Sequence, residues 1–268
     1  MRSALVLIVL ALAGPAAAQT TVPAMDCPEL TRAMQDLMRN DARLRDWPQL
    51  ERYRMANADL LREGSKVEVV FLGDSITDSW SNERFGGFFP GKGYVNRGIS
   101  GQTTPQMLVR LKPDVLAFSP KVIVLLAGTN DIAGNTGPQT DEDIQRNIAA
   151  IAELATANGA RMVLASVLPV SAYHVTPGAP PQTVRRPPAR INTLNTWLKT
   201  YAAAHKHVYL DYFSATADER GMLRVELSDD EIRKRMSSWK PPAPQFETGV
   251  MAKYAKLVSS ASLGAITN

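Results

Sequence analysis

The run Val67-Glu68-Val69-Val70-Phe71-Leu72, followed by Gly73-Asp74-Ser75-Ile76-Thr77, decides the fold class of this chain. Its first six residues are mostly apolar and β-branched, and a glycine ends the run. A short run of this kind, without polar alternation, is typical of a strand buried on both faces in a parallel sheet. Comparable runs occur at residues 121–126, 161–168 and 207–210, with a weaker candidate at 94–96. The sequence therefore predicts five short strands.

Helical patterns lie between these strand-like runs. Apolar residues recur at spacings of three and four over residues 104–111, 141–157 and 188–204. Strands that alternate with helices predict a parallel sheet covered by helices on both faces, which is the α/β class. The proline- and glycine-rich stretch 170–188 is expected to form a long loop, and loops of that length are often functional.

The first part of the chain has a different character. Residues 1–18 combine Arg2, an apolar run and three final alanines, which is the pattern of a cleavable signal peptide with cleavage after Ala18. Residues 19–65 are expected to form an N-terminal helical extension, and residues 66–268 a single α/β domain. We therefore expect a secreted or periplasmic protein without a membrane span in the mature chain.

Composition narrows the classes of function. The 268 residues are 45% hydrophobic and 21% charged, with a formal net charge of +4, one cysteine and three histidines. This apolar fraction excludes a disordered chain, and a single cysteine excludes a disulfide framework and a cysteine-based zinc site. A nucleic-acid partner is not predicted, because the sequence shows no basic stripe with interleaved aromatic residues.

Three short segments carry the candidate chemistry, and each follows a predicted strand: 73–77 (GDSIT), 98–102 (GISGQ) and 128–131 (GTND). In open α/β sheets, ligands bind at the carboxyl ends of the strands. The first segment places Ser75 in a tight turn before a helix, where its hydroxyl can be exposed. The second supplies a glycine N–H that can approach a ligand, and the third supplies Asn130, whose amide can donate to a developing negative oxygen. Together these are the parts of a nucleophile with an oxyanion hole.

The three segments resemble the first three sequence blocks of the SGNH (GDSL) hydrolase superfamily, in the same order. The matching residues are Gly73–Thr77, Asn96–Gly101 and Gly128–Asp131, and the resemblance covers roughly residues 66–230. It implies a flavodoxin-like, three-layer α/β/α domain with a five-stranded parallel sheet, and ester hydrolysis without metal or cofactor. The lipase elbow Gly-x-Ser-x-Gly is not found at this serine, which argues against an ordinary α/β-hydrolase.

Carried over residue by residue, the resemblance implies that Ser75 is the nucleophile. It also implies that the N–H groups of Ser75 and Gly101 and the side chain of Asn130 are the oxyanion donors. Gly101 is chosen over Gly98 because the family's glycine follows the Ile-Ser pair. In the family's fourth block, Asp-x-x-His-Pro, the aspartate orients the histidine that acts as general base.

Asp230 matches the acid of the fourth block, whereas Arg233 stands at the position of the histidine. Arginine keeps its proton and has no acceptor, so it cannot take the proton of Ser75. Three explanations are open. The chain is a catalytically impaired relative that keeps the pocket, or it carries an insertion, frameshift or other local sequence error over residues 233–248, or His174 in the long loop serves as the base.

The remaining candidates have simpler interpretations. His205 and His207 lie between a predicted helix and a predicted strand, so we expect them at the opposite edge of the sheet. Asp131 is expected to hold its loop by accepting hydrogen bonds. The predicted function is therefore hydrolysis of short acyl esters or acetylated carbohydrate by Ser75. The alternative is a catalytically silent protein that binds an ester or glycan in the same place.

Overall fold

The computed structural model describes residues 28–81, 88–89, 92–171 and 178–227. The chain forms two compact units, one that ends at Leu44 and one that begins at Arg45. Most of α1 (Pro28–Arg45) belongs to the first unit, and this region is helical as predicted. Among the described residues, no helix combines the length and the apolar character needed to cross a membrane.

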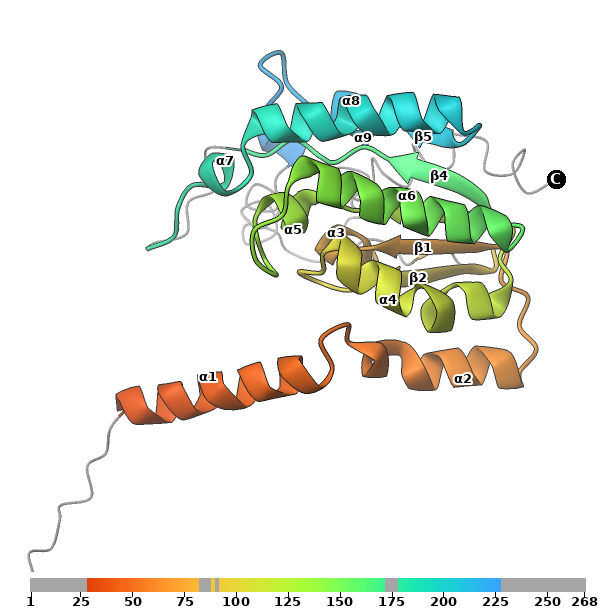
Figure 1. The fold of residues 1–268 in the computed structure, drawn as a ribbon, viewed down its shortest axis with the longest axis horizontal. Helices are drawn as coiled ribbons and strands as arrows, with labels where there is room; N and C mark the ends of the chain where they lie inside the picture. The colour runs from red at the N-terminus through yellow and green to blue at the C-terminus, as the bar shows by residue number, and fades with distance from the viewer. Residues whose placement is uncertain (1–27, 82–87, 90–91, 172–177, 228–268) are drawn as a thin grey trace, which may run out of the picture. The chain divides into compact units, whose positions relative to one another are not determined.

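The second unit is built on a five-stranded parallel sheet (Figure 1). Its strands are β1 (Val69–Gly73), β2 (Tyr94–Gly98), β3 (Val122–Leu126), β4 (Arg161–Ala165) and β5 (Val208–Leu210), in the spatial order β2-β1-β3-β4-β5. All five predicted strands are confirmed. Gly73 pairs with Gly98 of β2 and with Leu126 of β3, so these three strands end at the same edge of the sheet.

The long helices also lie where the sequence predicts them. They are α2 (Arg54–Arg62), α4 (Thr104–Asp114), α6 (Asp141–Ala157) and α8 (Pro188–Ala204). Shorter elements are α3 (Ser75–Ser79), α5 (Thr129–Ile132), α7 (Gln182–Arg185), α9 (Tyr212–Thr216) and the 3₁₀ turns η1 (Leu50–Tyr53), η3 (Leu116–Phe118) and η4 (Val225–Leu227). Apart from α3 and from η1, which lies within the predicted helical extension, these short elements were not predicted, because a single turn is too short to show a helical period.

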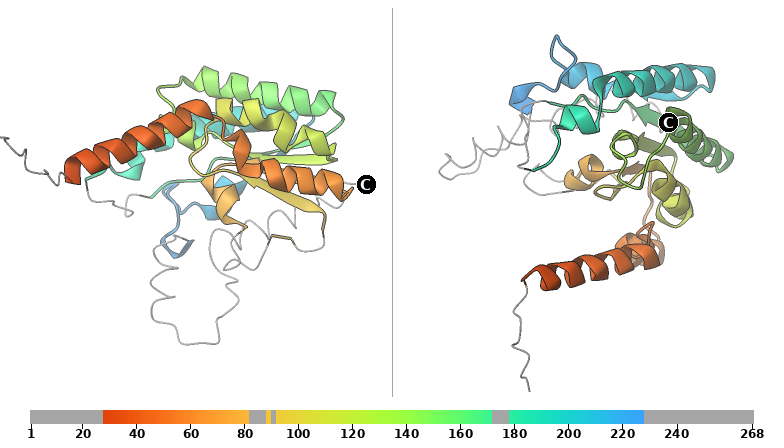
Figure 2. Two further views of the ribbon diagram at one scale, coloured as in Figure 1. Left: turned by 90° about the horizontal axis from the view of Figure 1, so that it is seen from below. Right: turned by 60° about the vertical axis from the view of Figure 1, so that its left-hand side comes forward.

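Alternate residues of the strands point to opposite faces and build two apolar cores. On one face, Val70 and Leu72 pack with buried residues of α4, α6 and α8. On the other face, Phe71 packs with Trp80, which follows α3, and with Tyr212 of α9. Figure 2 shows α4 and α6 on one side of the sheet and α9 on the other. The predicted α/β class, with helices on both faces of a parallel sheet, is therefore confirmed.

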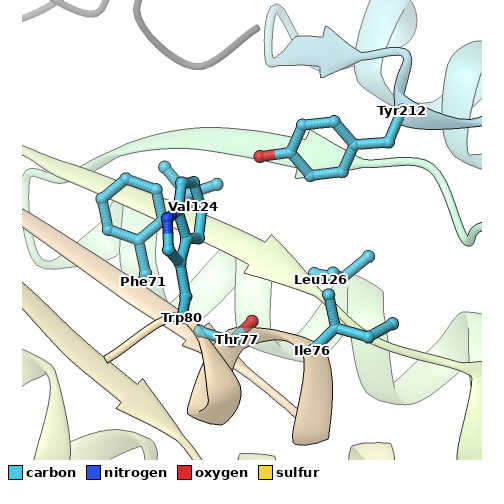
Figure 3. Close-up of a pocket in the computed structure, with 7 residues that line it drawn as sticks. All are labelled: Phe71, Ile76, Thr77, Trp80, Val124, Leu126 and Tyr212. Carbon is cyan, nitrogen blue, oxygen red and sulfur yellow. The ribbon is translucent and has the colours of Figure 1, made fainter. Parts of the chain in front are cut away.

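The second core is rich in aromatic rings. The Phe71 ring lies 5.6 Å from the ring centroids of both Trp80 and Phe89. In Figure 3, the Tyr212 side chain of α9 points toward Phe71 and Trp80, and these three side chains line a small cavity. The enclosed cavity is about 10 Å³ and is lined by Phe71, Ile76, Thr77, Trp80, Val124, Leu126 and Tyr212. A space of this size holds at most one water.

A buried polar network joins α2 and α4 to the sheet. Arg110 of α4 is fully buried, and its Nη1 lies 3.2 Å from Oδ2 of the equally buried Asp114. Its Nη2 donates to the carbonyl of Gly73 at 3.1 Å, and its Nε donates to the side chain of Gln102. Asn57 of α2 donates to the other Asp114 oxygen at 2.7 Å. Every charge here is paired or hydrogen-bonded, which is the condition for burying charged groups at acceptable cost.

Replacing Arg110 by methionine tests this network. Arg110→Met leaves Asp114 buried without its cation, so we expect the free energy of unfolding to fall by about 3–5 kcal/mol in urea titrations. Arg146→Met is the matched control, because its pair with Asp143 is exposed, and it should cost less than about 1 kcal/mol. The double variant Arg110→Met/Asp114→Leu should regain part of the loss. Equal losses for the two single variants would contradict the role of the network.

Candidate active site

The first loop of the site is the turn that joins β1 to α3. Asp74 is the N-cap of α3, and its Oδ1 accepts a hydrogen bond from the Ile76 N–H at 3.0 Å. Ser75 is the first residue of the helix and is half-buried, whereas Asp74 is fully buried. Only glycine fits at position 73, since a Cβ there would lie 2.1 Å from Thr77 Oγ1. The turn therefore presents Ser75 at the surface of a tightly packed strand end.

The second loop follows β2 and packs directly on the first. The Ile99 N–H donates to the Gly73 carbonyl at 3.0 Å. Ser100 donates from both its N–H and its hydroxyl to Asp78 of α3, at 3.1 and 2.7 Å. Gly101 has a φ of +82°, a left-handed conformation that favours glycine, and its carbonyl accepts from Asn135 Nδ2 at 3.0 Å. These bonds fix the direction of the backbone around Gly101 relative to α3.

The third loop is α5, which contains Asn130. This side chain is buried, and both ends of its amide are held. Nδ2 donates to the carbonyl of Gln102 at 3.0 Å, and Oδ1 accepts from Arg186 Nη2 at 3.1 Å. A primary amide nitrogen carries two protons, so one N–H of Asn130 has no part in the bond to Gln102. The neighbouring Asp131 accepts from the Thr104 N–H at 2.9 Å and from its hydroxyl, which is the loop-holding role predicted for it.

The three loops meet at one edge of the sheet, the carboxyl ends of β2, β1 and β3, which are adjacent strands (Figure 1). The loop of Gly101 is bonded to the strand end before Ser75 on one side and, through Gln102, to Asn130 on the other. Ser75, Gly101 and Asn130 are therefore brought to the same edge by direct contacts between their loops. A half-buried serine flanked by donor groups at such an edge suits nucleophilic attack with stabilisation of a negative oxygen.

Buried carboxylates give the site its electrostatic character. Burial raises the pKa of Asp74 to about 6, against the opposing effects of the Ile76 N–H bond and the Arg186 charge. Burial also raises the pKa of Asp131, against the hydrogen bonds from Thr104. The second oxygen of each carboxylate has no hydrogen-bond partner among the described residues. An anion in this region is therefore favoured mainly by the neighbouring N–H donors and by Arg186.

The acid and base expected from the fourth sequence block are not placed by the structure. Asp230, Arg233 and His174 lie outside the described residues. His205 is the C-cap of α8, and His207 directly precedes β5, so both lie at the amino edge of the parallel sheet, opposite the three loops. This is the position predicted for these two histidines. Among the described residues, no group of three or more histidine, cysteine, aspartate or glutamate side chains is arranged to hold a metal ion.

Several residues that shape the site were missed by sequence reasoning. They are Arg110, which braces the Gly73 carbonyl, and Gln102, Asn135 and Arg186, which hold the loops of Gly101 and Asn130. Polar residues in loops usually face solvent, so nothing in their local sequence distinguishes them. Arg186 lies in the proline-rich stretch 170–188, whose length was the only signal that pointed to function.

The raised pKa of Asp74 gives a testable pH dependence. Between pH 3.8 and about 6, the folded state keeps a proton on Asp74 that the unfolded state has released. The protonated Asp74 therefore makes its full contribution to the free energy of unfolding below pH 3.8, and this contribution is lost as the pH rises through about 6. Asp74→Asn keeps the cap acceptor but cannot ionise. In urea titrations, the stability of Asp74→Asn relative to the original chain should rise by up to about 3 kcal/mol between pH 4 and pH 7.

Asp143→Asn is a control with the opposite sign. Thr140 donates to Asp143 through its hydroxyl and its N–H, and these bonds lower the pKa of Asp143. Its contribution to stability is present above the ordinary pKa of 3.8 and is lost as pH falls. A stability difference between Asp74→Asn and the original chain that stays constant from pH 4 to pH 7 would contradict the buried, protonated carboxyl.

Two of the solved structures similar to this chain are described as an acylhydrolase and as a GDSL-like lipase. A candidate acylhydrolase from Bacteroides fragilis is 33% identical, with a TM-score of 0.66, over 82% of this chain and 98% of that one. A GDSL-like lipase from Bacteroides thetaiotaomicron is 32% identical, with a TM-score of 0.64, over 82% of this chain and 97% of that one. Both similarities cover nearly the whole length of the Bacteroides proteins.

A second likeness is local. A 56-residue stretch is 52% identical to the dihydroxy-acid dehydratase of Thermosynechococcus vestitus, and 58 residues are 50% identical to that of Trichodesmium erythraeum. The chain spans only 10% of the length of these curated relatives, so their activity is not carried over.

Residues 71–233, more than half of the chain, match the GDSL-like Lipase/Acylhydrolase family. This range contains the three loops described above and the sheet that carries them, apart from Val69 and Val70 at the start of β1. The order of the strands is also that of the similar solved structures. The chain belongs to the GDSL-like lipase/acylhydrolase family, the SGNH hydrolases.

Proposed function

We propose that this protein is a secreted or periplasmic serine ester hydrolase that acts on short acyl esters or acetylated carbohydrate. The observation that carries the proposal is the contact between three loops at one sheet edge, which brings Ser75, Gly101 and Asn130 together. Family membership supports ester hydrolysis as the type of reaction.

The proposed reaction begins when Ser75 Oγ attacks the carbonyl carbon of the ester. The hydroxyl proton passes to a base, and the carbonyl oxygen becomes an oxyanion that accepts from the N–H groups of Ser75 and Gly101 and from Asn130 Nδ2. The tetrahedral species then expels the alcohol, which takes up the proton, and leaves an acyl-serine. Water attacks the acyl group in the same way, and the carboxylic acid is released with Ser75 restored.

The proton transfer needs an acceptor, and the chain has three histidines. His205 and His207 lie at the opposite edge of the sheet, which leaves His174 as the histidine for this step. Asp230 is the proposed acid partner, by its place in the resemblance. Both residues lie outside the described part of the chain, so their roles rest on the sequence alone.

The alternative function is binding without turnover. It is favoured by Arg233 at the position of the family's histidine and by the location of His205 and His207. Reading the gene across codons 229–249 distinguishes a natural segment from a sequence error.

Hydrolysis of p-nitrophenyl acetate by the purified mature protein separates the two functions. If Ser75 is the nucleophile with a working base, Ser75→Ala should lower kcat by about 10⁴–10⁶-fold. Asn130→Ala should lower kcat by about 10²–10³-fold, because it removes one oxyanion donor. His174→Gln should match Ser75→Ala if His174 is the base. Equal rates for the original chain and Ser75→Ala would overturn the proposed function and leave the binding protein.

A further inference from the structure

Two consecutive arginines lie against the loops that hold the proposed oxyanion donors. Arg185 ends α7 and Arg186 follows it, so both belong to the segment between β4 and α8. The Arg186 guanidinium is fixed on three sides. Its Nε donates to the hydroxyl and the carbonyl of Thr129 at 3.0 and 3.2 Å, its Nη1 to the side chain of Gln182, and its Nη2 to Asn130 Oδ1 at 3.1 Å.

Together with the Gln102 carbonyl, this contact fixes the orientation of the Asn130 amide. The last torsion of an asparagine side chain is broad and nearly two-fold, so without partners the amide nitrogen and oxygen can exchange places. Arg186 accepts no hydrogen bonds, and it therefore selects the oxygen of Asn130. Because Arg186 holds Oδ1, Nδ2 is directed toward the carbonyl of Gln102, 3.0 Å away, with its second proton available to a ligand.

Arg185 makes a weaker contact of the same kind with the second loop. Its Nη2 donates to Asn135 Oδ1 at 3.3 Å, and Asn135 Nδ2 donates to the carbonyl of Gly101 at 3.0 Å. The bond from Arg185 is exposed and long, so its contribution should be small. The two arginines therefore reach the two loops that follow β2 and β3, one directly at a donor residue and one through an intermediate side chain.

The surroundings of Arg186 keep its positive charge available. Its hydrogen-bond partners among the described residues are neutral oxygens of Thr129, Asn130 and Gln182. Asp74 interacts with Arg186 electrostatically, but the two side chains share no hydrogen bond: Asp74 Oδ1 accepts from the Ile76 N–H, and Oδ2 has no partner among the described residues. A partly buried cation without a neutralising carboxylate contact makes a nearby negative oxygen more favourable.

We propose that Arg186 is a positioning residue that orients Asn130 for the oxyanion, with Arg185 as a weaker support of the Gly101 loop. The inference rests on the proposed ester hydrolysis and adds a determinant from a segment that the three sequence blocks do not contain. It explains why the segment between β4 and α8 lies against the site, and it assigns this segment a part in transition-state binding.

Steady-state kinetics with p-nitrophenyl acetate tests the positioning role. Arg186→Gln should lower kcat by about 10–10²-fold, because a misplaced donor acts mainly in the transition state, and KM should change less than about twofold. Arg185→Gln should lower kcat by less than about threefold. Arg146→Gln, an exposed arginine on α6, is the control for loss of positive charge and should leave kcat unchanged. A kcat for Arg186→Gln within twofold of this control would overturn the proposal.

A double-mutant cycle separates positioning from general destabilisation. In an Asn130→Ala background, Arg186 has no amide to orient, so adding Arg186→Gln should cost less than about threefold in kcat. If the two substitutions multiply as independent effects, Arg186 does not act through Asn130, and the inference fails. Thermal unfolding of each variant identifies any loss of kcat that comes from partial unfolding.

A spectroscopic measurement decides the inference even if the protein does not hydrolyse esters. The side-chain NH₂ signals of Asn130 in a ¹⁵N spectrum are identified by their loss in Asn130→Ala. In Arg186→Gln, their exchange with solvent should rise by about tenfold or more and their shifts should change, because the amide is released. Unchanged signals would overturn the positioning role. Absence of Ser75-dependent hydrolysis with altered signals would instead overturn only the proposed function.

Discussion

The buried contact of Arg110 with Asp114 and with the Gly73 carbonyl is the interaction on which the geometry of the site depends. Burying an arginine removes a strongly solvated charge from water, and this is tolerated only when a counter-ion and acceptors replace that water. Here the replacements are Asp114, Gly73 and Gln102, and the last two flank the segments that carry Ser75 and Gly101. Because the buried Arg110 needs these acceptors, it also fixes the positions of the loops that contain Ser75 and Gly101.

A chain of hydrogen bonds connects Arg110 with Asn130 and Arg186. Gln102 uses its side chain to receive Arg110 and its backbone carbonyl to receive Asn130. Asn130 in turn is held from the outside by Arg186. The amide of Asn130 therefore lies between an internal support and an external one. Preorganised donors of this kind stabilise a negative oxygen without reorganising during the reaction, which is how such sites accelerate acyl transfer.

Sequence patterns predicted most of the fold, for identifiable reasons. The inner strands β1 and β3 are buried along their whole length and are therefore short apolar runs, whereas the edge strand β2 is partly exposed, contains Asn96 and Arg97 and gave a weaker signal. The long helices show apolar periodicity because one side packs on the sheet. The single-turn helices and the supporting contacts of Arg110, Gln102 and Arg186 were not predictable. They depend on distances between segments that are far apart in the chain, and the residues themselves have no periodic or compositional signature.

The candidate site was predicted in part. Ser75, Gly101 and Asn130 follow strands, and a parallel sheet places all strand ends of one kind at one edge, so their meeting followed from topology. The position of His207 was predictable for the same reason, since a residue before a parallel strand lies at the opposite edge. The general base could not be predicted, because Arg233 stands at the position of the expected histidine and the remaining candidate, His174, lies in a long loop.

The most direct test of the account is a crystal structure of the protein after reaction with a small alkyl phosphonate ester, which mimics the tetrahedral intermediate when it bonds to a serine. The account predicts an adduct on Ser75 Oγ, with the phosphoryl oxygen about 2.7–3.1 Å from the Ser75 N–H nitrogen, the Gly101 N–H nitrogen and Asn130 Nδ2. A phosphoryl oxygen directed away from Gly101 and Asn130, or labelling elsewhere with Ser75 unmodified, would contradict it.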